Sequence, residues 1–203
     1  MLITSIEKSD KNKGMLLVYI DNSYAFSLPE EDYLRLGFYE RKEISEEEIH
    51  YVKYDVNLRA AKAAGVKFLA LKLRTEKEVR EKLAGQGFAE EIIDKVVEEL
   101  ETLGYINDPE YTEKYIRSKL KLKPTSKRML LYELENKGIQ KEMILSTLEG
   151  FEVDELSVAE ALVLKKFARY DFKEEKTKKK IQAFLGQRGF GYGIINEILS
   201  KLT

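Results

Sequence analysis

The sequence contains no cysteine, and it has only one histidine and three prolines. The lack of cysteine excludes disulfide bonds, thiolate nucleophiles and cysteine metal sites. No apolar run approaches the ~18 residues that a membrane span requires, and the first residues lack the apolar core of a signal peptide. We therefore expect a cytoplasmic protein that has no membrane partner.

Charged residues make up 35% of the chain, and hydrophobic residues make up 43%. This balance, with so little proline, favours a helical, soluble protein over a disordered one. The net charge is only -1, but the charges are segregated along the chain. Residues 29–56 carry nine acids and four bases, residues 114–128 carry seven bases and no acid, and residues 165–190 carry nine bases and three acids. The near-neutral net charge therefore hides an acidic N-terminal region and two basic regions.

The first 28 residues alternate in the manner of strands, in the stretches LITSI, MLLVYI and YAFSL. The intervening KNKG and DNS are typical turns, so we expect a small antiparallel meander. After Pro29 the pattern becomes helical, and Ser45 followed by Glu48 predicts a capping box at the start of a helix.

An internal repeat of 51 residues organises the remainder of the chain. Leu83, Leu134 and Leu185 lie in one column of this repeat. Five further columns keep the same spacing without a gap: Gly87/Gly138/Gly189, Phe88/Ile139/Phe190, Val79/Leu130/Ile181, Thr75/Ser126/Thr177 and Ile93/Ile144/Ile195.

Each copy of the repeat predicts three helices. First helices are expected at about residues 57–72, 109–121 and 155–169, and the Thr75/Ser126/Thr177 column marks where second helices could start. Thr75 with Glu78 forms the clearest cap, and the glycine column ends the second helix because glycine readily adopts the left-handed backbone found there. Asp108 before Pro109, and Asp154 or Glu155, could start the later first helices.

We therefore expect a mainly α fold with three tandem three-helix repeats in an elongated array, preceded by a small N-terminal antiparallel β/α segment. The predicted boundaries are 1–54 for the N-terminal segment, 55–106 for the first repeat, 107–153 for the second and 154–203 for the third. Gly87, Gly138, Gly189, Leu83, Leu134 and Leu185 are the predicted structural residues.

The glycine-rich stretch GQRGFGYG at residues 186–193 raises the alternative of a phosphate-binding loop. Such a loop requires a preceding strand, whereas a helix precedes this one. Only Gly189 belongs to the repeated column, so we interpret the stretch as the third helix stop. Gly191 and Gly193 have no equivalents in the other copies, and they should loosen the start of the last helix.

No set of residues predicts catalysis, and we expect no catalytic residue, no metal site and no cofactor. His50 lies in an acidic helical segment without a second ligand candidate, so we interpret it as exposed or packed. The acids of AEEIIDKVVEEL alternate with apolar residues as a solvated helix face does. Tyr111 and Tyr115 lie one helical turn apart, and core packing is preferred over base stacking.

The basic residues at the junctions between first and second helices give the strongest functional signal. If the units stack regularly, equivalent positions form a basic stripe, although a solvated lysine face is the alternative. The predicted partner- or DNA-binding residues are Lys114, Arg117, Lys119, Lys121, Lys123, Lys127, Arg128, Lys165, Lys166, Arg169, Lys176, Lys178, Lys179, Lys180 and Arg188. Phosphate contacts of this kind would be independent of DNA sequence, because the helices after Gly87 and Gly189 lack suitable base-reading side chains.

Four stretches resemble the RecX family of bacterial RecA modulators: RTEKEVREKLAGQGF, LGYINDPEYTEKYIRSKL, LLYELENKGI and KKKIQAFLGQRGF. With the tandem units, the resemblance covers about residues 55–203. Two features depart from it, namely Lys123 in place of a glycine before Pro124, and the basic KTKKK in the third repeat. Local contacts there could therefore differ from those of the family.

The resemblance implies a regulatory protein that binds RecA and the RecA–DNA filament and mostly inhibits recombinase, ATPase and co-protease activity in DNA repair. Because no set of residues predicts catalysis, we expect a protein that is not an enzyme, and we also expect a monomer. One alternative is a sequence-independent nucleic-acid-binding protein that contacts the DNA phosphate backbone and acts without RecA. A helical scaffold for another protein is a further alternative.

Overall fold

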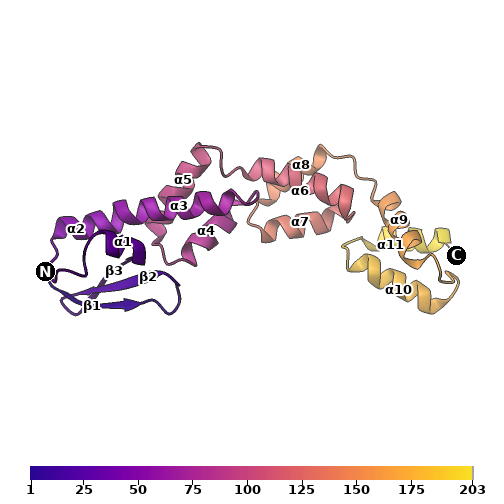
Figure 1. Ribbon diagram of the computed structural model, residues 1–203. Coiled ribbons are helices and arrows are strands. Elements are labelled where there is room, and N and C mark those ends of the chain that lie inside the picture. The colour runs from indigo at the N-terminus through magenta and orange to yellow at the C-terminus, as the bar shows by residue number, and fades with distance from the viewer. Residues whose placement is uncertain (203) are drawn as a thin grey trace. The chain divides into compact units, whose positions relative to one another are not determined.

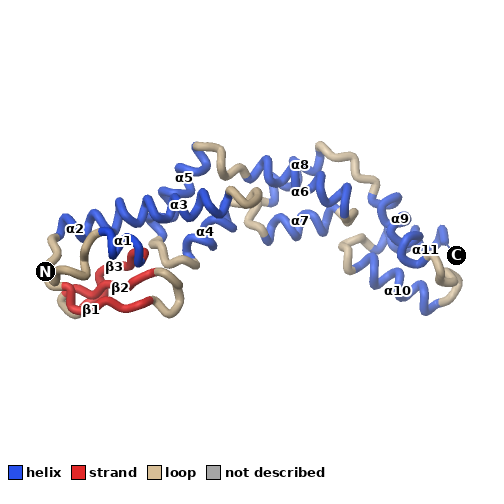
Figure 2. The backbone as a smooth tube through the Cα atoms, viewed as in Figure 1, coloured by secondary structure: helices blue, strands red, loops and turns tan. Residues whose placement is uncertain are grey.

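The structure is a computed structural model that describes residues 1–202 of the chain. Three N-terminal strands, β1 (Ile3–Lys8), β2 (Met15–Ile20) and β3 (Ser23–Pro29), form an antiparallel sheet in the order β1-β2-β3 (Figure 2). Val18 pairs with Phe26, and Leu16 pairs with Leu28. These four side chains are buried on the same face of the sheet, and the predicted antiparallel meander is confirmed.

A helical layer covers this sheet. It begins with α1 (Glu30–Arg35) and continues with α2 (Glu46–Tyr51), the π-helical turn η1 (Val52–Val56) and α3 (Asn57–Leu69) (Figure 1). The predicted capping box at the start of α2 is confirmed, because Ser45 Oγ accepts from the Glu48 N–H and the Glu48 carboxylate accepts from the Ser45 N–H. The helical run from α2 through η1 to α3 is continuous, so no loop separates the predicted N-terminal segment, 1–54, from the predicted first repeat, 55–106.

The first repeat consists of α3, α4 (Glu76–Ala84) and α5 (Glu90–Thr102). Its core includes Ala61, Val79, Leu83, Ile93 and Leu100, all of which are at most 1% exposed. Apolar residues three and four positions apart therefore face one shared interior.

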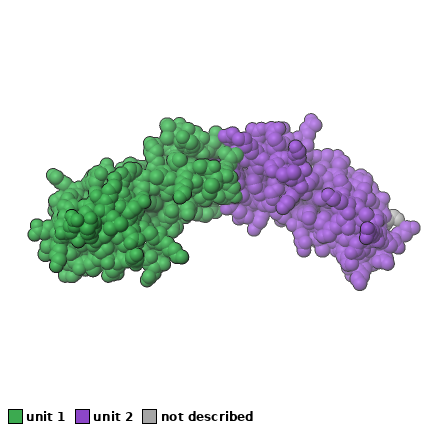
Figure 3. Space-filling view, in the orientation of Figure 1, with its two compact units in different colours: residues 1–107 green, residues 108–203 purple. Residues whose placement is uncertain are grey.

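The second repeat consists of α6 (Asp108–Leu122), α7 (Lys127–Asn136) and α8 (Lys141–Glu149). The third consists of α9 (Glu155–Phe167), α10 (Glu175–Gly186) and α11 (Tyr192–Leu202). Each repeat has its own apolar core, which confirms the predicted three-helix units. The chain divides into two compact units, Met1–Asn107 and Asp108–Thr203 (Figure 3). Within residues 1–202, no helix is long and apolar enough to span a membrane.

The repeated glycines end α4, α7 and α10 in the same way. Gly87, Gly138 and Gly189 have positive φ angles of 88°, 89° and 79°. The residue after each glycine donates its backbone N–H to the carbonyl of the repeated leucine, in the pairs Phe88–Leu83, Ile139–Leu134 and Phe190–Leu185. This hydrogen bond, five residues back along the chain, is that of a Schellman helix stop. It explains why the leucine, glycine and apolar columns repeat together, since the three leucines are also fully buried.

The start of the second helix differs among the repeats. Thr75 and Ser126 accept from backbone N–H groups of the first turn and act as caps, as predicted. Thr177 does not, because α10 begins at Glu175 and Thr177 lies buried inside the helix, so that expectation was wrong. At the start of α9, Asp154 is the capping residue.

Candidate partner-binding groove

A groove in the C-terminal unit lies where the second and third repeats meet. It has a volume of about 580 Å³, and α6, the loop after it, α7, α9 and the turn after α10 all contribute to it. Four of the predicted binding residues line this groove: Lys119, Lys123, Lys165 and Arg188. They come from positions up to 69 residues apart in the chain, so the fold brings together cations that the sequence could only place in two separate regions.

The two repeats are joined directly below this groove. The carbonyl oxygen of Arg188 accepts hydrogen bonds from Ser126 Oγ at 2.8 Å and from Thr125 Oγ1 at 3.2 Å. Thr125 and Ser126 are buried, so both hydroxyls need these partners. A second link joins the Lys127 backbone N–H to the Glu155 carboxylate at 2.6 Å. The helix stop of the third repeat thus docks on the helix start of the second.

Gly189 is required for this docking as well as for its positive φ. A Cβ atom at this position would lie 2.5 Å from Ser126 Oγ and 3.2 Å from both the Cβ and the backbone N of Met129. The sequence predicted the helix stop but not the close approach of another repeat. A Cβ at Gly87 would also come close to another element, at 2.5 Å from the amide group of Asn12 in the β1–β2 turn, but there it would meet only this one side chain.

The groove contains one acidic side chain, Glu133, which is already satisfied. Lys119 forms an ion pair with it at 2.7 Å, and the Tyr115 hydroxyl donates to it at 2.8 Å. Burial, together with the hydrogen bond to Glu133, raises the pKa of Tyr115 well above its usual range, so this hydroxyl stays protonated and remains a donor. The network holds Lys119 in place and neutralises much of its charge.

The remaining cations of the groove carry most of its positive potential. Lys123 and Lys165 are exposed and have no ion-pair partner within residues 1–202. Arg188 places its guanidinium 4.0 Å from the centre of the Phe184 ring, where it packs but keeps its charge. The exposed side chain of Leu122 adds an apolar wall. The arrangement suits an anionic partner with some apolar surface.

The other predicted binding residues lie outside this groove. Lys114 pairs with Glu110 at 2.6 Å and Arg117 with Glu113 at 2.5 Å, each one helical turn along α6. Lys178 pairs with Glu175, Lys166 lies over Phe184, and Lys180 lies over Tyr170. Lys127 and Arg128 line a separate hollow of about 370 Å³. The structure gives no ion pair for Lys121, Arg169, Lys176 or Lys179 among the residues it describes.

Sequence reasoning did not identify Thr125, Met129, Glu133 or Gln187 as part of the groove. The sequence points to this junction only through Ser126, whose repeat column marks it as a helix start, and Thr125 is its neighbour in the chain. Tyr111 and Tyr115 stack with ring centres 6.0 Å apart and pack against the core of the second repeat. The predicted core packing of these two rings is therefore confirmed.

The residues considered for catalysis make ring and ion-pair contacts with their neighbours. His50 is exposed and its ring lies tilted against that of Tyr54, with ring centres 4.5 Å apart. On α5, Asp94 pairs with Arg80 at 2.6 Å, on the face opposite its buried stripe. Across the described part of the chain, no group of three or more acidic or histidine side chains could hold a metal ion.

Comparison with known proteins gives three family-model matches. The first, second and third three-helix domains of RecX match residues 61–100, 107–148 and 152–199. A regulatory protein RecX of Clostridium botulinum (strain Alaska E43 / Type E3) is 30% identical over 203 residues, covering 98% of this chain and 95% of the relative. One of Caldanaerobacter subterraneus subsp. tengcongensis is 31% identical over 200 residues, covering 98% and 99%.

Two solved structures share the fold. A crystal structure of a regulatory protein RecX superposes with a TM-score of 0.66 at 26% identity, covering 97% of this chain and 98% of the other. The crystal structure of RecX from Lactobacillus salivarius gives a TM-score of 0.62 at 28% identity, covering 72% of this chain and 96% of the other. The repeats, their helix stops and these matches agree: the chain belongs to the RecX family of regulatory proteins.

Proposed function

We propose that this protein binds a RecA filament on DNA and restrains its recombinase, ATPase and co-protease activities without being an enzyme itself. The observation that carries the proposal is the convergence of Lys123, Lys165 and Arg188 on one groove between two repeats. A cationic groove with an apolar wall can bind DNA phosphates or an acidic surface of the filament.

The repeated architecture supports binding to a helical partner. Each three-helix unit offers a modest contact, and linked contacts strengthen one another because the later ones form at high effective concentration. The proposal therefore requires a filament that presents equivalent surfaces to successive units. It also requires no chemical step by the protein.

The test is the ATP hydrolysis of RecA filaments on single-stranded DNA, measured while the protein is titrated in. We expect a Lys123→Glu/Lys165→Glu variant to lose inhibition at concentrations where the wild type inhibits fully. Lys119 is left intact because its ion pair with Glu133 also stabilises the fold. Lys141→Glu is the matched control, since Lys141 is an exposed lysine of the same unit and does not line the groove.

Inhibition that survives in the double variant, or that is lost equally in the Lys141→Glu control, would contradict the proposed role of the groove. Circular dichroism of each variant shows whether the helices remain folded. If the protein has no effect on the filament at any concentration, the RecA part of the proposal is wrong.

The groove also fits a nucleic-acid-binding protein that acts without RecA, and salt dependence separates the two functions. Three phosphate contacts on a single strand predict that log K falls with log salt concentration with a slope of about -2. Binding to bare DNA with this slope, and no tighter binding to RecA filaments, would favour the alternative. A complex with filaments that persists at a salt concentration that removes the protein from bare DNA would favour the proposal.

A further inference from the structure

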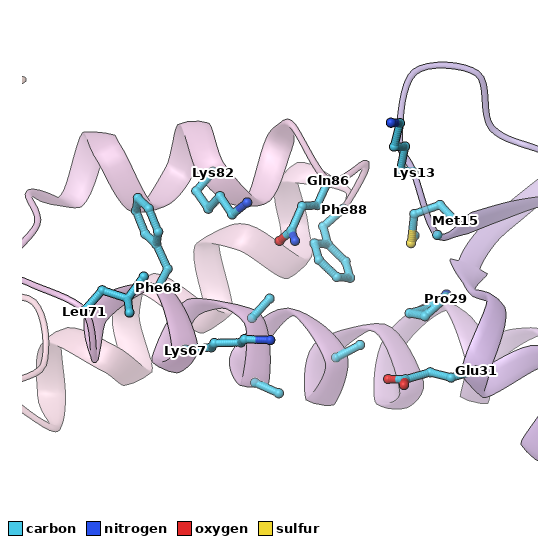
Figure 4. Close-up of a pocket in the computed structure, with 14 residues that line it drawn as sticks. Lys13, Met15, Pro29, Glu31, Lys67, Phe68, Leu71, Lys82, Gln86 and Phe88 are labelled. Atoms are coloured by element: carbon cyan, nitrogen blue, oxygen red, sulfur yellow. The ribbon is translucent and has the colours of Figure 1, made fainter.

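A second cleft lies in the N-terminal unit, between the β1–β2 turn and the helices α3 and α4 (Figure 4). Its volume is about 520 Å³. None of the predicted binding residues lines it, and the proposed role of the C-terminal groove makes no use of it. The cleft is lined by residues of both the N-terminal sheet region and the first repeat, which were predicted from the sequence as two separate segments.

The floor of the cleft is apolar and shallow. Ala60, Ala63 and Ala64 line it from α3, at the spacing that places residues on one face of a helix. Because alanine has no atoms beyond Cβ, this face leaves room for the side chain of a partner. Phe68 and Phe88, both half-buried, stand at the sides of the floor (Figure 4).

The rim of the cleft is cationic. Lys13 from the turn, Lys67 from α3 and Lys82 from α4 line it, against a single acid, Glu31. All three lysines are exposed, and none has an ion-pair partner in the part of the chain that the structure describes. Cations around an apolar floor attract a partner that is acidic and also carries an apolar side chain.

The environment of the Phe68 ring favours a peptide over a nucleotide as the ligand of this cleft. A bound base needs a free ring face, but the Arg74 guanidinium lies 4.1 Å from the Phe68 ring centre and Lys82 Nζ lies 6.0 Å from it. Cations therefore already occupy this ring.

We propose that this cleft binds an acidic peptide segment of a partner protein, with one bulky apolar side chain of the peptide seated on the alanine face of α3. The acidic residues of the peptide lie against Lys67, Lys82 and Lys13. This binding does not depend on RecA or on the groove in the other unit, so it can be measured with the full-length protein alone.

The probe is a fluorescein-labelled peptide in which a Leu-Phe pair is flanked on both sides by glutamates, and the readout is fluorescence anisotropy. We expect saturable binding that is lost when lysines replace the glutamates, and that weakens at least about tenfold when Ser-Gly replaces the Leu-Phe pair. Lys67→Glu/Lys82→Glu should weaken binding about tenfold, because it removes two exposed ion pairs with the peptide and puts like charges in their place. Lys72→Glu is the matched control, because Lys72 is an exposed lysine of the same segment and does not line the cleft.

A second variant keeps every charge and fills the floor. Ala63 is exposed on α3, so Ala63→Phe should fold normally and block the seat of the apolar side chain. We expect it to weaken binding of the Leu-Phe peptide and to leave binding of the Ser-Gly peptide unchanged. Equal effects of Lys67→Glu/Lys82→Glu and Lys72→Glu, or full binding by Ala63→Phe, would overturn the proposal. So would displacement of the peptide by an oligothymidine strand that itself needs Lys67 and Lys82, because the cleft would then be a nucleic-acid site.

Discussion

Substitution of Gly189 by alanine tests the idea that the repeated glycine both ends a helix and joins two repeats. The alanine must keep the backbone φ of 79° that Gly189 has, which costs a side-chain-bearing residue about 1–2 kcal/mol. It must also displace Ser126 Oγ, which would lie 2.5 Å away, and crowd Met129 on α7. Loss of the buried Ser126–Arg188 hydrogen bond adds about 1–2 kcal/mol, so we expect a total loss of about 2–4 kcal/mol.

Gly87→Ala is the matched comparison, because its φ of 88° is as unfavourable but its neighbour is different. The atoms that meet its Cβ belong to the side chain of Asn12, whose amide donates to the Gly85 carbonyl at 2.7 Å when correctly oriented. This side chain can swing toward water, whereas Ser126 and Met129 are fixed at the start of α7. We therefore expect Gly87→Ala to cost only about 1–2 kcal/mol.

The assay is urea unfolding of the full-length protein, followed by far-UV circular dichroism. Gly189→Ala should also weaken filament inhibition, because Thr125 and Arg188 both line the groove at the junction that it disturbs. A destabilisation by Gly189→Ala that is no larger than that of Gly87→Ala would refute the docking role. Full inhibition by a folded Gly189→Ala protein would refute its link to the groove.

Three further changes test other features of the fold. Gly193→Ala should stabilise the protein by about 0.5–1 kcal/mol in thermal unfolding, since Gly193 lies in α11 with no atom within 4 Å of the added Cβ, and destabilisation would show that its flexibility has a structural role. Leu134→Ala should cost about 2–5 kcal/mol in urea unfolding, because this side chain is fully buried; a smaller cost would mean that the second repeat closes around the space. Glu48→Gln tests a pH effect. Hydrogen bonds from the Ser45 backbone and then from Arg41 lower the pKa of Glu48 in the folded protein. The contribution of Glu48 to folding stability is therefore present above the ordinary glutamate pKa and is lost as the pH falls through the lowered pKa. The variant should therefore be less stable than the wild type at neutral pH and equally stable in acid, and a difference that persists in acid would contradict this cause.

Much of the fold could be predicted from the sequence because local rules govern it. The stop after α4, α7 and α10 needs only a leucine, a glycine and an apolar residue at fixed spacing, and the hydrogen bonds that form it stay within six residues of the chain. The strand register follows from alternation, and the capping boxes follow from residues three apart. The sequence gives the wrong cap at Thr177 because a cap depends on where the helix begins, and α10 begins three residues earlier than the repeat predicts.

The binding surfaces could be predicted only in part. A run of lysines marks a cationic region, but it does not show which side chains are neutralised by acids just outside the run, as Lys114 is by Glu110. Nor does it show that Lys123 and Lys165 line one groove, since they lie 42 residues apart. The pairing of Lys119 with Glu133 also needs two helices to pack first.

By itself, the sequence determined the three repeats, their helix stops, their buried leucines and the charge segregation, because these depend on neighbours along the chain. Only the tertiary structure decided where the repeats meet, which cations share a groove and where the N-terminal sheet leaves a cleft on α3. Gly189 belongs to both groups: its positive φ follows from the helix stop, and its contact with Ser126 arises only when the third repeat packs on the second. The physical reason is that backbone conformation is set over a few residues, whereas a binding surface is made by side chains that only folding brings together.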